Sequence, residues 1–196
     1  MKISPITLSL LCLFTGILSA QPPGTGSLPP LPAHPRLLIT DPEIPAIKAR
    51  IEKDPVLKAR YSAMVKKADE WVLKKTGLPE RGGQWGHYYA CADDGARLVT
   101  VSSATHKCPV CGRVYTGWPY DDVLLGNIHN SYSAAVRDLG FIYRLTSQRK
   151  YADKAREILL AYAERYRAYP LHDIKGKDTA SAGRVMAQTV GYSSVS

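Results

Sequence analysis

Two pairs of amphipathic segments, separated by a long insert without helical periodicity, are the feature that most limits the folds open to this chain. Within each segment apolar side chains recur at i, i+3, i+4 and i+7, the spacing that places them on one face of an α-helix. The predicted helices cover residues 41–52, 55–76, 128–146 and 150–169. The polar pair Ser147-Gln148 separates the last two, and such a short connection favours antiparallel packing. The sequence therefore predicts an all-α fold built from helical hairpins.

The apolar stripes of the last two helices identify much of the expected core. The stripe of residues 128–146 comprises Tyr132, Ala135, Val136, Leu139, Ile142 and Tyr143. The stripe of residues 150–169 comprises Tyr151, Ala155, Ile158, Leu159, Tyr162 and Tyr166. Because helical spacing turns these side chains toward a common core, we interpret their aromatic rings as core residues rather than as a platform for sugars.

The first 20 residues have the pattern of a signal peptide. Lys2 is followed by an apolar stretch, Ile3 to Leu18, and then by the small residues Ser19-Ala20. A membrane anchor is the alternative, but the stretch is short for a bilayer span and is interrupted by polar residues. We therefore expect a secreted or periplasmic protein, with no stable membrane span after cleavage. Residues 21–35 are rich in proline and read as an extended linker.

The charge balance favours an anionic partner. The chain has 26 Lys and Arg against 17 Asp and Glu, a formal net charge of +9. Nucleic acid, a lipid surface and an acidic polysaccharide all fit such a balance. Because secretion disfavours nucleic acid, we expect an acidic polysaccharide.

The insert, residues 80–127, contains two turns of similar spacing. Cys108-Pro-Val-Cys111-Gly112 has the C-x-x-C-G pattern of a zinc knuckle, whose glycine tolerates the tight turn around a thiolate. Cys91-Ala-Asp-Asp94-Gly95 has the same spacing, with Asp94 where a second cysteine is expected. This pattern predicts a zinc-knuckle-like insert of otherwise irregular structure.

We expect one structural zinc ion at these turns. The predicted ligands are Cys91, Asp94, Cys108 and Cys111, with His106 as the alternative fourth ligand and His87 as a spare nitrogen donor. A disulfide and plain thiols are the alternatives in a secreted protein. Three cysteines outside the leader leave one unpaired, however, and the two in the C-P-V-C turn are poorly placed to pair with each other.

Two groups of residues are candidates for binding a sugar. Trp85, His87 and Tyr88 combine aromatic rings with polar tips, which suits carbohydrate stacking and suits the small core of a knuckle equally well. His129 and Asn130 stand at the predicted start of the third helix, where side chains and the helix N-terminus can meet an anion. The alternative there is that Asn130 caps the helix and His129 is a solvated loop residue.

Several segments together resemble the N-terminal region of heparinase II/III-like polysaccharide lyases, which belong with the alginate and chondroitin lyases. The segments are HPRLLIT at 34–40, HYYAC at 87–91, CPVCGRVYTG at 108–117, HNSYSAAVRDLG at 129–140 and YADKA at 151–155. The resemblance implies that residues 36–190 form part of an α/α toroid of helical hairpins, which is followed in the family by a β-sandwich. It also implies cleavage of uronate-containing glycans by β-elimination outside the cytoplasm.

Catalytic residues cannot be assigned in this chain. A toroid of about six hairpins needs on the order of 250 residues at roughly 40 per hairpin, whereas four helices form at most two hairpins. Residues 191–196 show neither period nor cap and read as a truncated end. The resemblance places the catalytic Asn, His and Tyr residues beyond this point. The candidates within the chain show no spacing that assigns the roles of base, acid and neutralising group: Tyr88, Tyr89, His87, His129 and Arg137.

The chain is therefore expected to be an inactive N-terminal fragment of a polysaccharide lyase. One alternative is a secreted zinc-knuckle or glycan-binding helical module without catalysis. Another is a small secreted helical protein with an unrelated interaction role.

Overall fold

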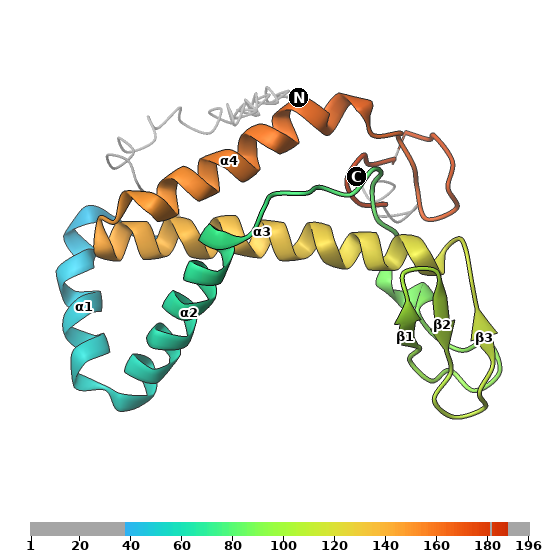
Figure 1. The fold of residues 1–196 in the computed structure, drawn as a ribbon, viewed down its shortest axis with the longest axis horizontal. Coiled ribbons are helices and arrows are strands. Elements are labelled where there is room, and N and C mark those ends of the chain that lie inside the picture. Colours follow the sequence, from blue (N-terminus) through green and yellow to red (C-terminus); the bar gives the residue numbers. More distant parts are fainter. Residues whose placement is uncertain (1–37, 181, 188–196) are drawn as a thin grey trace, which may run out of the picture.

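The computed structural model describes residues 38–180 and 182–187 as a mostly helical fold with one small sheet (Figure 1). Its helices are α1 (Ile44–Lys53), α2 (Pro55–Leu73), α3 (Tyr120–Thr146) and α4 (Arg149–Arg165). Its strands are β1 (Val99–Ser102), β2 (Thr105–Lys107) and β3 (Val114–Tyr115), and the three-residue 3₁₀ helices are η1 (Asp41–Glu43), η2 (Gly86–Tyr88) and η3 (Tyr166–Ala168). The predicted signal peptide (1–20), linker (21–35) and aberrant tail (191–196) lie outside the described residues. Of the helices in the described part, none combines the length and hydrophobicity that a bilayer crossing needs.

Helix α3 is the long axis of the molecule (Figure 1). Helix α4 returns along it after a tight turn at Ser147, which adopts a left-handed conformation with φ 59°. The α1–α2 hairpin lies at the C-terminal end of α3, and the sheet lies at its N-terminal end (Figure 1). The predicted antiparallel pairing of the last two helices is therefore confirmed.

The helical core is close to the predicted one. Its buried residues are Ala68, Trp71, Tyr132, Ala135, Leu139, Ile142, Tyr151, Ala155 and Ile158. Leu159 and Tyr166 were predicted to be core residues, and this is wrong, because they are 55% and 50% exposed. Helix α4 packs on α2 and α3 along one side only, and Tyr166 lies beyond the end of the α-helix, in η3. Two of the six residues of the predicted stripe therefore stay at the surface.

A buried lysine, which periodicity does not identify, joins α4 to the end of α2. Lys154 is 5% exposed, and its Nζ atom donates a hydrogen bond to the carbonyl oxygen of Lys74 at 2.5 Å. The same ammonium group lies 3.0 Å from the Glu157 carboxylate. The ammonium group thus satisfies a carbonyl left unpaired at the C-terminus of α2, where positive charge is favoured.

The insert is not irregular, and the prediction of an all-α chain is corrected here. Strands β1, β2 and β3 form an antiparallel sheet in that order. Helix α3 begins at Tyr120, well before the predicted residue 128, so residues 120–127 belong to the helix and not to the insert. The missed turns start with Asp121 and Asp122, which favour a helix N-terminus. The buried apolar residue of these turns, Val123, packs into the core of the insert and does not extend the stripe of the helical core. Apolar periodicity therefore did not indicate that the helix begins here.

The chain between α2 and the sheet runs along α3 and passes it at a very short distance (Figure 1). Gly83 donates a hydrogen bond to the carbonyl of Val185 at 2.8 Å, and its own carbonyl accepts one from Ala187 at 3.0 Å. A Cβ atom built on Gly83 would lie 2.1 Å from the Cα atom of Gly126 in α3. The backbone of residues 82–84 is therefore held between α3 and the segment 182–187, and only glycine fits at position 83.

We expect Gly83→Ala to lower the free energy of unfolding by about 3 kcal/mol, because the new methyl group can be accommodated only if two backbones separate. Gly86→Ala is the matched control, since a Cβ atom there meets nothing within 4 Å. Urea unfolding of both variants measures the difference. An equal, small effect at the two positions would contradict the close approach described here.

Candidate metal centre and neighbouring groove

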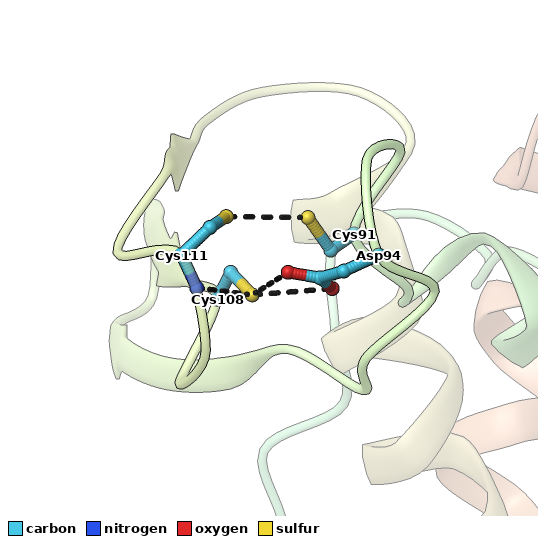
Figure 2. Close-up of side chains that lie close together, drawn as sticks. All are labelled: Cys91, Asp94, Cys108 and Cys111. Atoms are coloured by element: carbon cyan, nitrogen blue, oxygen red, sulfur yellow. Dashed lines mark hydrogen bonds between the residues drawn. The ribbon is translucent and has the colours of Figure 1, made fainter.

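The first knuckle is a closed turn that begins at Cys91 (Figure 2). The Cys91 amide donates to the carbonyl of Ala96 at 2.8 Å, and the Gly95 amide donates to the carbonyl of Cys91 at 3.0 Å. Gly95 has φ +71°, a left-handed conformation that favours glycine. Ala90 and Arg97 pair across the base of the turn in an antiparallel bridge.

The second knuckle repeats this turn bond for bond. The Cys108 amide donates to the carbonyl of Arg113 at 2.8 Å, and the Gly112 amide donates to the carbonyl of Cys108 at 3.1 Å. Gly112 has φ +77°. Lys107 and Val114, the equivalents of Ala90 and Arg97, pair across its base as part of the sheet. The two turns are therefore copies of one structure, in which Asp94 occupies the position of Cys111.

The two knuckles face each other, so that four potential ligand atoms converge (Figure 2). The ligand atoms of Cys91, Asp94, Cys108 and Cys111 all lie within 4.8 Å of one another. The Cys91 and Cys111 sulfurs are 3.5 Å apart, and the Cys108 sulfur lies 3.3 Å from Oδ2 of Asp94. Thiolates bound to zinc at about 2.3 Å stand about 3.8 Å apart around a tetrahedron. The three thiols are free, and the cluster could hold a metal ion such as zinc.

Hydrogen bonds prepare part of this cluster for a cation. The Tyr115 hydroxyl, 3.1 Å from the Cys91 sulfur, is the main cause of the lowered pKa of Cys91. The Ala96 amide likewise holds the pKa of Asp94 below its ordinary value. At Cys111 the Arg113 amide favours the thiolate, but burial and the neighbouring ligand groups outweigh it and raise the pKa to about 11. A bound cation would displace that thiol proton, as metals do at cysteine sites.

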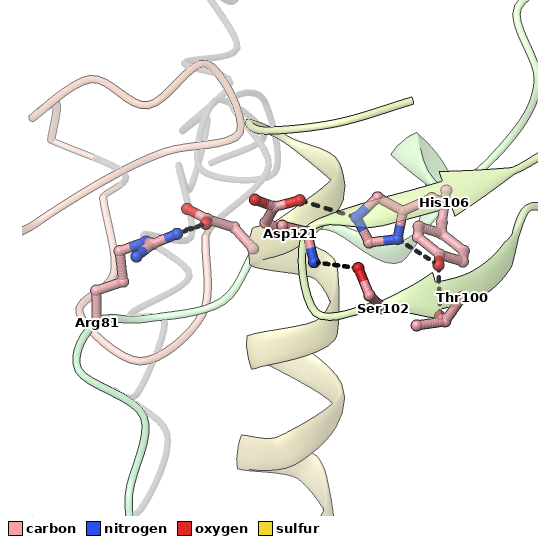
Figure 3. A network of polar contacts seen from close by, with 8 residues as sticks. Arg81, Thr100, Ser102, His106 and Asp121 are labelled. Carbon is pink, nitrogen blue, oxygen red and sulfur yellow. Dashed lines mark hydrogen bonds and ion pairs between the residues drawn. The ribbon is translucent and has the colours of Figure 1, made fainter. Parts of the chain in front are cut away.

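His106, the alternative fourth ligand, is not part of the cluster. It is fully buried and lies between the Tyr89 hydroxyl, 2.8 Å from Nδ1, and the Asp121 carboxylate, 2.8 Å from Nε2. This network links strand β2 to the first turn of α3 (Figure 3). Both ring nitrogens of His106 are therefore occupied by partners outside the knuckles. Asp94 is therefore the fourth potential ligand, as its spacing predicts.

We expect the purified chain to bind one metal ion, and Asp94→Ala or Cys108→Ser to weaken that binding by more than tenfold because a direct ligand is lost. His106→Gln is the control, since it alters a buried imidazole in the same sheet without touching the cluster. Metal analysis after dialysis measures the stoichiometry, and Co²⁺ absorption reports thiolate ligation. Retention of metal by Asp94→Ala together with its loss in His106→Gln would contradict this assignment.

An open groove of about 550 Å³ lies beside the first knuckle. Three of the predicted sugar-binding residues meet in it, namely Trp85, His87 and Asn130. The Trp85 and His87 rings are in tilted contact with centroids 4.3 Å apart, and Trp85 is 37% exposed. Tyr88, also predicted, packs against the core of the insert instead. Packing in the core of the insert is thus confirmed for Tyr88, whereas carbohydrate stacking by Trp85 and His87 stays a prediction.

Tyr89 and Arg97 also line the groove. The sequence named Tyr89 only among the candidate catalytic residues and did not identify Arg97, which lies two residues after Gly95. The exposed Arg97 forms no ion pair with any residue in the described part of the chain. The repeated C-x-x-[CD]-G spacing could have indicated Arg97, because in both turns the second residue after the glycine pairs with the residue before the first cysteine and so closes the base of the turn.

His129 does not border the groove, and both interpretations of its position are wrong. It lies inside α3 because the helix starts at Tyr120, and it is 3% exposed. Its Nδ1 atom accepts a hydrogen bond from the Tyr162 hydroxyl at 2.7 Å, and its Nε2 atom donates one to the Arg81 carbonyl at 3.0 Å. Asn130 also lies inside α3, far from its first residue, and does not cap the helix. The groove is therefore lined by Asn130 but not by His129.

Stability is expected to fall at acidic pH because of His129. Burial is the main cause of the lowered pKa of His129 in the folded chain. An unfolded histidine, with a pKa of about 6.5, takes up a proton that the folded chain resists. The stabilisation that comes from neutral, buried His129 is therefore fully present above the unfolded pKa. It is lost as the pH falls toward the lowered pKa of His129 in the folded chain.

Urea unfolding at about pH 7.5 and about pH 5.5 measures this loss, across the unfolded pKa of histidine. In His129→Gln the difference between the two pH values should shrink, whereas His87→Gln, which changes an exposed histidine, should leave it unchanged. An unaltered difference in His129→Gln would show that other groups cause the acid sensitivity.

The chain has no significant match among protein-family models, curated proteins or solved structures.

Proposed function

We propose that this chain is the N-terminal, glycan-holding part of a secreted or periplasmic lyase for uronate-containing polysaccharides, and that it does not cleave its substrate alone. The observation that carries the proposal is the groove, where Trp85, Arg97 and Asn130 meet. Aromatic rings stack on the apolar faces of sugars, and guanidinium and amide groups bind carboxylates. An acidic glycan combines both features. The two helical hairpins would be the first units of a larger α/α toroid.

Zinc is the metal that we propose for the cluster, with a structural role. Thiolates are soft ligands and the carboxylate is a hard one, and Zn²⁺, a borderline ion, binds both kinds. With all four positions taken by protein atoms, no position is left for substrate or water, and structural zinc sites have this closed form. Cys91, Asp94, Cys108 and Cys111 would therefore hold the insert together rather than take part in the reaction.

The proposed absence of cleavage follows from the chemistry of β-elimination. The reaction needs a group that neutralises the uronate carboxylate, a base for the C5 proton and an acid for the leaving oxygen. Arg97 and Asn130 fit the first role. The Tyr89 hydroxyl is already engaged with His106 and with Thr100, at 2.8 Å and 2.6 Å, so it does not serve as a free base or acid. The base and acid are expected from other parts of the complete enzyme.

We expect the zinc-loaded chain to bind hexasaccharides from alginate, chondroitin sulfate or heparan sulfate, and Arg97→Ala to weaken binding about tenfold because a charge-assisted hydrogen bond is lost. Arg156→Ala is the matched control, since it removes the same charge from the exposed face of α4. Calorimetric titration measures the affinity. The ultraviolet absorbance of an unsaturated uronate should not rise.

Binding that Arg97→Ala and Trp85→Ala leave unchanged would refute the proposed groove. Product formation by the purified chain would refute the proposed lack of activity and would place the catalytic residues among those present.

A further inference from the structure

The first knuckle forms one wall of the groove. Tyr89 and Ala90 directly precede Cys91, Gly95 directly follows Asp94, and all three line the groove. Arg97, which closes the base of the same turn, lines it as well. The metal cluster and the groove therefore share one short stretch of backbone, although no residue that lines the groove belongs to the cluster of Cys91, Asp94, Cys108 and Cys111.

The opposite wall belongs to a different part of the fold. Trp85 and His87 stand at η2, Asn130 projects from α3, and Met186 comes from the segment near the end of the described chain. The backbone around Trp85 is fixed by the close contact of Gly83 with α3, and the Gln84 amide bonds to the Asp122 carbonyl at 2.9 Å. This wall adjoins the helical body, and none of its residues belongs to the ligand cluster.

Cys91 and Cys108 share the small apolar core of the insert, but few polar contacts besides the four ligands hold the tip of the first knuckle, residues 92–94, on the second. One is the ion pair of Asp93 with Arg113 at 2.8 Å, whose side chains are 46% and 53% exposed. An ion pair so exposed to water contributes little. The other is the Tyr115 hydroxyl, which accepts a hydrogen bond from the Ala92 amide at 2.9 Å and contacts the Cys91 sulfur. A metal ion bound to all four residues would link Cys91 and Asp94 of the first knuckle to Cys108 and Cys111 of the second.

We infer that metal binding at Cys91, Asp94, Cys108 and Cys111 controls the affinity of the groove for an anionic sugar by fixing Arg97. This inference rests on the proposed function of the groove. The metal ion holds the turn from Cys91 to Gly95, the turn positions Arg97 through its bridge with Ala90, and Arg97 then faces Trp85 and Asn130 at a constant spacing. Without the ion the Arg97 wall moves relative to the helical body, and binding pays the entropy of ordering it. Cys111, on the far knuckle, acts as a positioning residue for a groove that it does not touch.

The test is a thermodynamic cycle on the full chain. Affinity for the three hexasaccharides is measured with zinc bound and after removal of zinc by a chelator, in the wild type and in Arg97→Ala. We expect zinc removal to weaken wild-type binding about tenfold, and to change Arg97→Ala binding by less than about twofold, because the interaction that the metal supports is already absent. Cys111→Ser should reproduce the effect of zinc removal.

Hydrogen exchange provides a readout that needs no glycan. Removal of zinc should speed exchange at the amides of residues 91–98 and leave α4 protected. The matched control is Ile142→Val, which weakens the helical core at a fully buried position far from the groove. It should lower the thermal midpoint without changing the affinity for the hexasaccharides.

The possible results separate the inference from the proposed function. If wild-type binding depends on Arg97 but not on zinc, the coupling is refuted and the glycan groove stands. If the zinc-loaded wild type binds none of the hexasaccharides, or if Arg97→Ala binds as the wild type does, the proposed function fails and the inference with it. Loss of the helical circular-dichroism signal on zinc removal would also refute the inference, because the effect would then be global unfolding.

Discussion

Helix α3 is one wall of two separate cores, and the rest of the structure depends on this arrangement. Near its N-terminus Val123 packs with the buried residues of the insert, while Leu139 and Ile142 pack with α2 and α4 near its C-terminus. Between the two, Gly126 lets the backbone at Gly83 cross the helix in direct contact. A single rigid helix therefore sets the distance between the cysteine-bearing insert and the helical hairpins.

The metal cluster depends on symmetry between two local turns rather than on a long-range fit. Each knuckle is closed by its own backbone hydrogen bonds and its own left-handed glycine, so its ligands are oriented before the two turns meet. Replacing a thiolate by the Asp94 carboxylate keeps the ligand charge, because both groups are monoanions when a cation is bound. It also introduces one hard oxygen donor, which disfavours the softest metals relative to a site of four thiolates.

The groove is located where these two systems meet. One wall follows the first knuckle and the other follows the helical body, so its shape reflects how the two are held together. Part of the positive charge of the chain lies in the groove, since Arg97 is exposed and forms no ion pair within the described residues. Charge composition alone suggested an anionic partner, whereas the presence of Arg97 in the same groove as Trp85 suggests where such a partner would bind.

The sequence by itself determined the features that depend on neighbouring residues. Apolar periodicity predicted four helices, and the two C-x-x-[CD]-G turns predicted the ligand set, because both patterns reflect the backbone over a few residues. Only the tertiary structure decided that His106 joins Tyr89 and Asp121 instead of a metal, that His129 is buried, and that Arg97 faces Asn130. These relations link residues far apart in the chain through the packing of the insert on α3. Local spacing carries no information about such packing, because it depends on side chains from both partners at once.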